Sequence, residues 1–93
     1  MDLSTIDPAV IEARGRYATV NGEYKTLMST MQSWAQQACD GVRHGLNEPN
    51  VEAAQKLFDD AATLCDKLKV YAAKAAELKE QKDELWPIAW GNL

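Results

Sequence analysis

The sequence predicts an all-α protein: a long antiparallel helical hairpin that pairs with a second copy into a four-helix bundle. Two apolar patterns with a seven-residue period run through the 93 residues, and a short segment rich in glycine, asparagine and proline separates them. This period is typical of packed helices, and a short connection makes consecutive helices antiparallel neighbours. We expect one helical domain, residues 1–93, with helices over 8–45 and 49–86, a bend over 45–50 and an aromatic tail over 87–93.

The first helix opens with a start signal. The Asp7 side chain can accept hydrogen bonds from free amides of the first turn, and Pro8 follows at the first helical position, where its missing N–H costs nothing. Ile6 is placed to pack on Ile11 as a hydrophobic staple. Two apolar rows then recur every seven residues: Val10, Tyr17, Tyr24, Met31 and Ala38, and beside them Ala13, Val20, Leu27 and Trp34.

The dipeptide Asn21-Gly22 is a conflict within the first helix, because it is common in turns. A break there would give three helices. However, the apolar row keeps its phase from Tyr17 to Tyr24, across Gly22, whereas a turn has no reason to preserve it. We expect a continuous helix, with a kink at Gly22 as the local alternative.

The bend and the second helix follow from glycine and proline positions. Gly41 and Gly45 can end the first helix through left-handed caps, and Pro49 or Asn50 can start the next one. The second helix is expected to end before Pro87, because proline lacks the amide that a helix interior needs. Its two apolar rows are Leu57, Leu64, Tyr71, Leu78 and Leu85, and Ala54, Ala61, Leu68 and Ala75.

Each helix carries more apolar surface than the contact of a two-helix hairpin needs. A lone hairpin would leave a further row on each helix in water, so we expect a partner there, with a homodimer as the simplest form. These rows are Met28, Ala35 and Val42, and Val51, Phe58, Cys65 and Ala72. The residues expected in the core or the dimer contact are Tyr17, Tyr24, Met28, Met31, Trp34, Leu57, Phe58, Leu64, Leu68, Tyr71 and Leu78.

Two cysteines, Cys39 and Cys65, are too few for a disulfide scaffold and lack the Cys and His spacing of a zinc site. We expect both to be reduced, buried thiols. With a bend centred near residue 47, Cys39 should face position 56, which leaves Cys65 about nine residues, or about 13 Å, away. That separation argues against an intramolecular disulfide.

Catalytic signals are nearly absent from the sequence. His44 is the single histidine, beside Arg43 at the bend, and no Ser/His/Asp or Cys/His arrangement can be built around it. The adjacent carboxylates Asp59 and Asp60 should point about 100° apart on a helix and so do not converge on one metal ion. We expect a protein that is not an enzyme and has no cofactor or metal. Arg43 and His44 are expected to be polar contacts for a protein partner.

Charge and targeting signals favour a cytoplasmic protein that binds neither nucleic acid nor membranes. The net charge is −4, from 14 acidic and 10 basic residues, which does not suit an anionic partner. The first ten residues have neither the basic segment nor the apolar stretch of a signal peptide. No run of about 18 apolar residues, the length of a membrane span, occurs in the chain.

Apolar side chains are concentrated near the C-terminus, at Trp86, Ile88, Trp90 and Leu93. Two interpretations stay open. These side chains can fold back over the end of the bundle close to Ile6 and Ile11, or they can act as anchors for a partner, because tryptophan is enriched among binding hot spots.

These features favour a non-catalytic interaction protein that binds a partner protein and blocks or adapts it. Small acidic helical proteins of this kind are often antagonists encoded by phages or mobile elements, so we hypothesise an inhibitor of a host protein. The alternative is a secretion or assembly component, or a chaperone, whose apolar stripe is completed by a larger complex.

Overall fold

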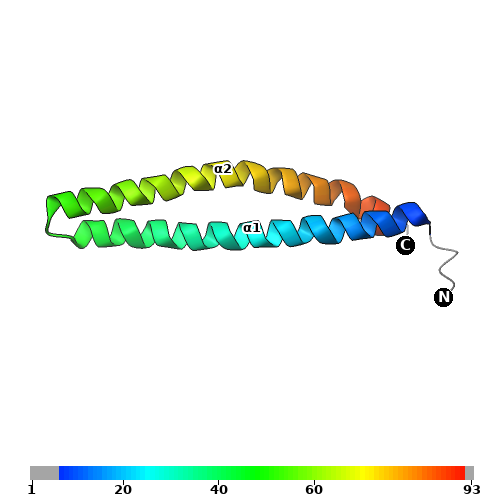
Figure 1. The fold of residues 1–93 in the computed structure, drawn as a ribbon, viewed down its shortest axis with the longest axis horizontal. Helices are drawn as coiled ribbons and strands as arrows, with labels where there is room; N and C mark the ends of the chain where they lie inside the picture. The colour runs from blue at the N-terminus through cyan, green and yellow to red at the C-terminus, as the bar shows by residue number, and fades with distance from the viewer. Residues whose placement is uncertain (1–6, 92–93) are drawn as a thin grey trace. The chain divides into compact units, whose positions relative to one another are not determined.

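The computed structural model describes residues 7–91 and forms a helical hairpin (Figure 1). Helix α1 spans Pro8–Asn47, helix α2 spans Val51–Trp90, and three residues connect them. The described residues contain no strand. The predicted all-α hairpin is therefore confirmed. The expected staple residue Ile6 and the expected anchor Leu93 lie outside the described residues.

Side-chain caps start both helices. The Ala9 amide donates to Asp7 Oδ1 at 2.9 Å, as the sequence predicted for the start of α1. At the start of α2 the Ala53 amide donates to Asn50 Oδ1 at 3.0 Å. Asn50 is thus the capping residue, and α2 begins two residues later than the position expected from Pro49.

Helix α1 runs without a break through Gly22, as expected, and also through Gly41 and Gly45, which was not expected. The prediction that these last two glycines end the helix in left-handed caps was wrong, since no described residue has a positive φ. Gly45 serves close packing instead, because a Cβ there would lie 2.6 Å from the Phe58 ring. At Gly41 a Cβ would lie 3.6 Å from the Ala61 Cβ, an ordinary van der Waals contact.

Helix α2 continues through Pro87 to Trp90, so the predicted helix end at Trp86 was wrong, and so was the start of a separate tail at residue 87. Proline removes one amide from the helix, but contacts with α1 hold the last turn in place. Ala89 is only 1% exposed, and Arg14 Nε donates to the Ala89 carbonyl oxygen at 2.9 Å. The Gly91 amide closes the turn by donating to the Pro87 carbonyl oxygen at 2.8 Å.

The chain divides into two compact units, each built from a stretch of both helices. In the terminal unit, of which residues 7–26 and 74–91 are described, the core consists of Ala13, Leu85 and Ala89, with Tyr17 and Trp90 packed against it. Because Tyr17 contacts Trp86 and the earlier Arg14 contacts Ala89, the two helices are antiparallel in this unit.

The bend unit comprises Leu27–Ala73 and is antiparallel in the same way. Trp34 stacks at a tilt on Tyr71 with ring centroids 4.7 Å apart, and the Lys67 ammonium lies 5.5 Å from the Trp34 ring. Nearer the connection, Gly45 lies under Phe58. The buried hydrophobic side chains of this unit are Leu27, Ala38 and Ala61.

Every residue of the four predicted apolar rows is buried or half-buried. Gly41, Gly45, Lys82 and Ala89 continue the same spacing and are also buried or half-buried, and we call the complete set the seam. The seam buries little, because its fully buried members are mostly alanines. In the described chain no large side chain is less than 2% exposed.

Alanine at Gly15 or Gly22 should stabilise the protein. A Cβ at either position meets nothing within 4 Å, and both positions are exposed. Each substitution should add about 0.5–1 kcal/mol to the free energy of unfolding, because alanine restricts the unfolded chain and favours the helix. Thermal unfolding followed by circular dichroism would show a rise of a few degrees in the midpoint.

Gly45→Ala is the contrasting variant, since its new Cβ would have to displace the Phe58 ring. It should gain clearly less stability than the other two. Equal gains for all three variants would contradict the close packing of Phe58 on Gly45.

Candidate protein-binding faces

The register of the seam divides the rest of each helix into two flanks. Successive residues on a helix are turned by about 100°, so residues that directly follow a seam residue lie on one side and those that directly precede one lie on the other. We call the first set the apolar flank and the second the polar flank. The names reflect where the exposed large hydrophobic residues lie.

Exposed large hydrophobic side chains are concentrated on the apolar flank. Ile11, Val42, Leu46, Phe58 and Trp86 each directly follow a seam residue, and Val51 precedes Phe58 by seven residues in the same row. The exceptions, Val70 and Ile88, precede seam residues. Within each unit, therefore, most of the exposed large hydrophobic side chains lie on the apolar flank.

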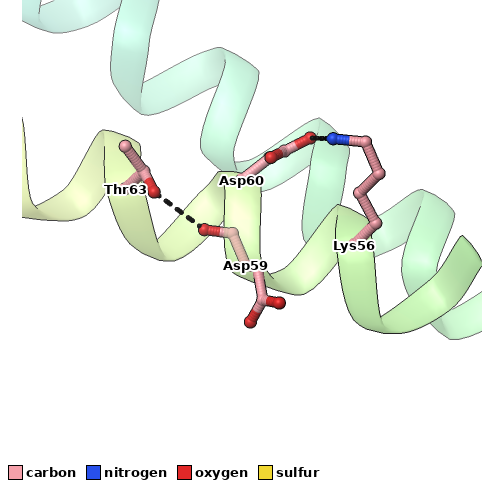
Figure 2. A network of polar contacts seen from close by, with 4 residues as sticks. All are labelled: Lys56, Asp59, Asp60 and Thr63. Atoms are coloured by element: carbon pink, nitrogen blue, oxygen red, sulfur yellow. Dashed lines mark hydrogen bonds and ion pairs between the residues drawn. The ribbon is translucent and has the colours of Figure 1, made fainter. Parts of the chain in front are cut away.

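The polar flank is covered by hydrogen-bonding side chains. Figure 2 shows part of it on α2, where Lys56 Nζ lies 3.4 Å from Asp60 Oδ2 and Thr63 Oγ1 donates to the Asp59 carbonyl oxygen at 3.1 Å. Such exposed pairs contribute at most about 0.5 kcal/mol each. They keep this flank compatible with water rather than adding much stability.

In the terminal unit, the apolar flank carries a cluster of three aromatic rings. Trp86 and Trp90 lie one turn apart on α2 with ring centroids separated by 4.9 Å, and Tyr17 of α1 lies 5.5 Å from the first and 5.1 Å from the second. The Arg14 guanidinium lies 5.5 Å from the Trp90 ring. Trp90 is half-buried by these neighbours, whereas Trp86 remains 52% exposed.

Lys82 of α2 extends this cluster toward Tyr24 of α1. Lys82 is half-buried, and its Nζ lies 4.5 Å from the Tyr24 ring centroid and 5.9 Å from that of Tyr17, within the range of cation–π contacts with both rings. The cluster thus combines rings held by their neighbours with a cationic rim. Of the residues predicted as partner anchors, Trp86 and Trp90 belong to it, but Ile88 lies on the polar flank and is 54% exposed.

In the bend unit, the apolar flank forms a hollow of about 400 Å³ between the helices. Its lining is nearly all apolar and includes the alkyl stem of one basic residue. The lining residues are Ala38, Cys39, Val42, Arg43, Leu46 and Cys65. Arg43 also lies 3.9 Å from the Asp40 carboxylate, and His44 is exposed on the polar flank.

The cysteines correct two expectations. Both are exposed free thiols rather than buried ones, because each follows a seam residue instead of occupying one. They also line the same hollow, so the expected separation of about nine residues along the hairpin was wrong. The facing pairs Trp34 with Tyr71 and Gly45 with Phe58 explain this difference, because they put the level of Cys39 on α2 near residue 65 rather than 56.

The residues predicted for the core or dimer contact divide into two groups. Leu78 is buried and most of the others are half-buried in the seam, while Phe58 is 38% exposed on the apolar flank. Sequence reasoning missed the bond from Arg14 to Ala89 and the one-sidedness of the exposed apolar residues. The second could have been found by reading the residue that follows each seam position.

Searches for a metal site, a membrane span and known relatives complete the description of the chain. No group of three or more His, Cys, Asp and Glu side chains within residues 7–91 is placed to hold a metal ion. None of the described helices contains a stretch long and apolar enough to cross a membrane.

Comparisons with protein-family models, curated protein sequences and solved structures yield no match.

Trp90→Ala should destabilise the protein by about 2 kcal/mol, because it removes ring contacts with Tyr17 and Trp86 and uncovers the end of the seam. Ile88→Ala, at an exposed position on the same turn, should cost less than about 1 kcal/mol. Denaturant unfolding at one fixed protein concentration compares the two. Equal losses would mean that Trp90 does not cap the terminal unit.

Proposed function

We propose that this chain is a non-catalytic interaction module that binds a partner protein through the apolar flank of its terminal unit and thereby blocks or adapts that partner. The main support for this proposal is the exposure of Trp86: its side chain is 52% exposed, although it contacts the rings of Tyr17 and Trp90. Tryptophan is enriched among the hot spots of protein interfaces.

The surroundings of Trp86 favour tight binding by lowering its entropic cost. Ordering a free side chain on binding costs about 0.5–1.5 kcal/mol, and contacts with Tyr17 and Trp90 meet that cost in the unbound protein. Lys82 adds a cationic rim over the tyrosines. The complementary partner surface is an apolar pocket with acidic or hydrogen-bonding groups at its edge.

A module of this kind acts stoichiometrically. Its effect on the partner should saturate when partner and module are equimolar, as expected of an inhibitor or adaptor without chemistry of its own. Turnover of a substrate by catalytic amounts of the chain would contradict the proposal.

Trp86→Ala should weaken partner binding at least tenfold, which corresponds to about 1.4 kcal/mol. The partner is first isolated by affinity capture with the wild-type chain, and titration calorimetry with the purified partner then measures affinity and stoichiometry. Gln81→Ala is the matched control, because Gln81 is exposed on the polar flank of the same unit. Its affinity should equal that of the wild type. Equal binding by the Trp86→Ala variant would overturn the assignment of this face.

A further inference from the structure

The apolar flank of the bend unit has the residue spacing of a second helix-packing seam. On α1 its central part consists of Ala35, Cys39, Val42 and Leu46, at successive intervals of four, three and four residues, and Met28 and Gln32 precede them on the same flank. On α2 the facing part consists of Phe58, Ala62, Cys65, Lys69 and Ala72, preceded by Gln55. The nine side chains of the two central parts are exposed, and Lys69 is the charged one among them, with Nζ 3.8 Å from Asp66 Oδ1. Intervals of three and four place residues on one stripe that another helix can cover. The same hollow borders both stripes, so one partner can cover them together.

The exposed area of the chain is large enough to supply an interface. The chain exposes 6898 Å². A compact monomer of 10.3 kDa exposes about 5,400 Å². The excess of about 1,500 Å² is above the roughly 800 Å² that each partner buries in a standard interface. A standard interface would therefore cover about half of this excess exposed area.

Four apolar side chains of this flank form two pairs of a large and a small residue. Val42 and Phe58 lie toward the connection, whereas Ala35 and Ala72 lie toward the other end, where Lys69 adds a charged side chain with an apolar stem. The cysteines lie between them: Cys65 is seven residues from both Phe58 and Ala72, and Cys39 lies three residues before Val42 and four after Ala35. In a reversed copy each of these two large side chains would meet a small one.

We propose that the apolar flank of the bend unit is covered by the same flank of a second copy, with the two hairpins antiparallel. A two-fold axis level with the cysteines places α1 on the second copy's α1 and α2 on its α2. Val42 then meets the small residue at position 35, and Phe58 meets the one at position 72. With the hairpins parallel, α1 would lie on the second copy's α2 at the same level, and Leu46, which follows the Gly45 that faces Phe58, would meet that large ring. The assembly is a four-helix bundle closed by an isologous contact.

The orientation makes a direct prediction for crosslinking by a short bis-maleimide on the purified full-length chain. In the antiparallel dimer each cysteine lies beside its own counterpart, so the single-cysteine variants Cys39→Ala and Cys65→Ala should each yield a covalent dimer. The double variant should yield none and serves as the control. In a parallel dimer Cys39 would lie beside the second copy's Cys65. Crosslinking of the wild type alone, with neither single variant reacting, would overturn the proposal.

The face itself is tested by a pair of matched substitutions in the bend unit. Val42 lies on the apolar flank and is 43% exposed, whereas Val70 lies on the polar flank and is 67% exposed. Val42→Glu buries a carboxylate in the contact and should weaken self-association about a hundredfold or more. Val70→Glu should change it less than about twofold. Sedimentation velocity measures both against the wild type, which should have twice the 10.3 kDa mass of one chain.

Three outcomes count against the second copy. One is a wild-type chain that sediments as a monomer, and another is equal weakening by both glutamates. The third is a monomeric wild type together with a Val42→Glu variant that no longer binds the isolated partner protein. That result would mean that the partner, and not a second copy, covers the apolar flank of the bend unit. Far-ultraviolet circular dichroism shows whether each variant remains helical. Trp86→Ala should leave the dimer intact, so failure of this proposal and failure of the proposed function are distinguishable.

Discussion

The structure depends on a narrow contact between two helices. Small residues at the seam, with Gly45 beneath Phe58 as the clearest case, let α1 and α2 approach closely. Close approach has a consequence for the core, because alanine and glycine bury little apolar area and leave the larger side chains half exposed. Two helices also have only one mutual surface. Every apolar residue beyond the seam must be covered from outside the hairpin or remain in water.

The two flanks resolve this constraint asymmetrically. Hydrogen-bonding side chains such as Lys56, Asp60 and Thr63 occupy the polar flank, while the opposite flank carries tryptophan in one unit and a thiol-lined hollow in the other. A hairpin with large exposed apolar residues on both flanks would have no polar flank to face the solvent, which favours aggregation. Concentrating most of the exposed large apolar residues on one flank of each unit favours that flank as the binding surface.

Much of this arrangement could be predicted from periodicity alone. The seam rows from Val10 to Ala38 and from Ala54 to Leu85 were correct because a seven-residue period records which face of a helix is covered. The errors came from local rules that tertiary contacts override. In the sequence, Gly45 and Pro87 both indicate the end of a helix. In the structure, Phe58 of α2 packs on Gly45, and Arg14 of α1 bonds to the turn that contains Pro87.

The candidate faces were predicted less well, for a related reason. Trp86 and Trp90 were singled out by composition, yet their separation from Ile88 depends on register, which decides the flank on which each residue lies. The relative level of Cys39 and Cys65 depends on the geometry of the connection, and a simple midpoint does not capture it. Contacts between distant residues, such as Arg14 with the Ala89 carbonyl, have no local sequence signature.

The proline within α2 also bears on the order in which the protein folds. In the second helix alone, the step past Trp86 is weakened because Pro87 supplies no amide there, and the Gly91 amide on the Pro87 carbonyl is the bond that closes the turn locally. Contacts from Arg14 and Tyr17, at the other end of the sequence, add the tertiary support of this turn. Amide exchange within that turn would therefore report the docking of the chain ends: slow while the ends are joined, and fast as soon as they separate, before the rest of α2 unwinds.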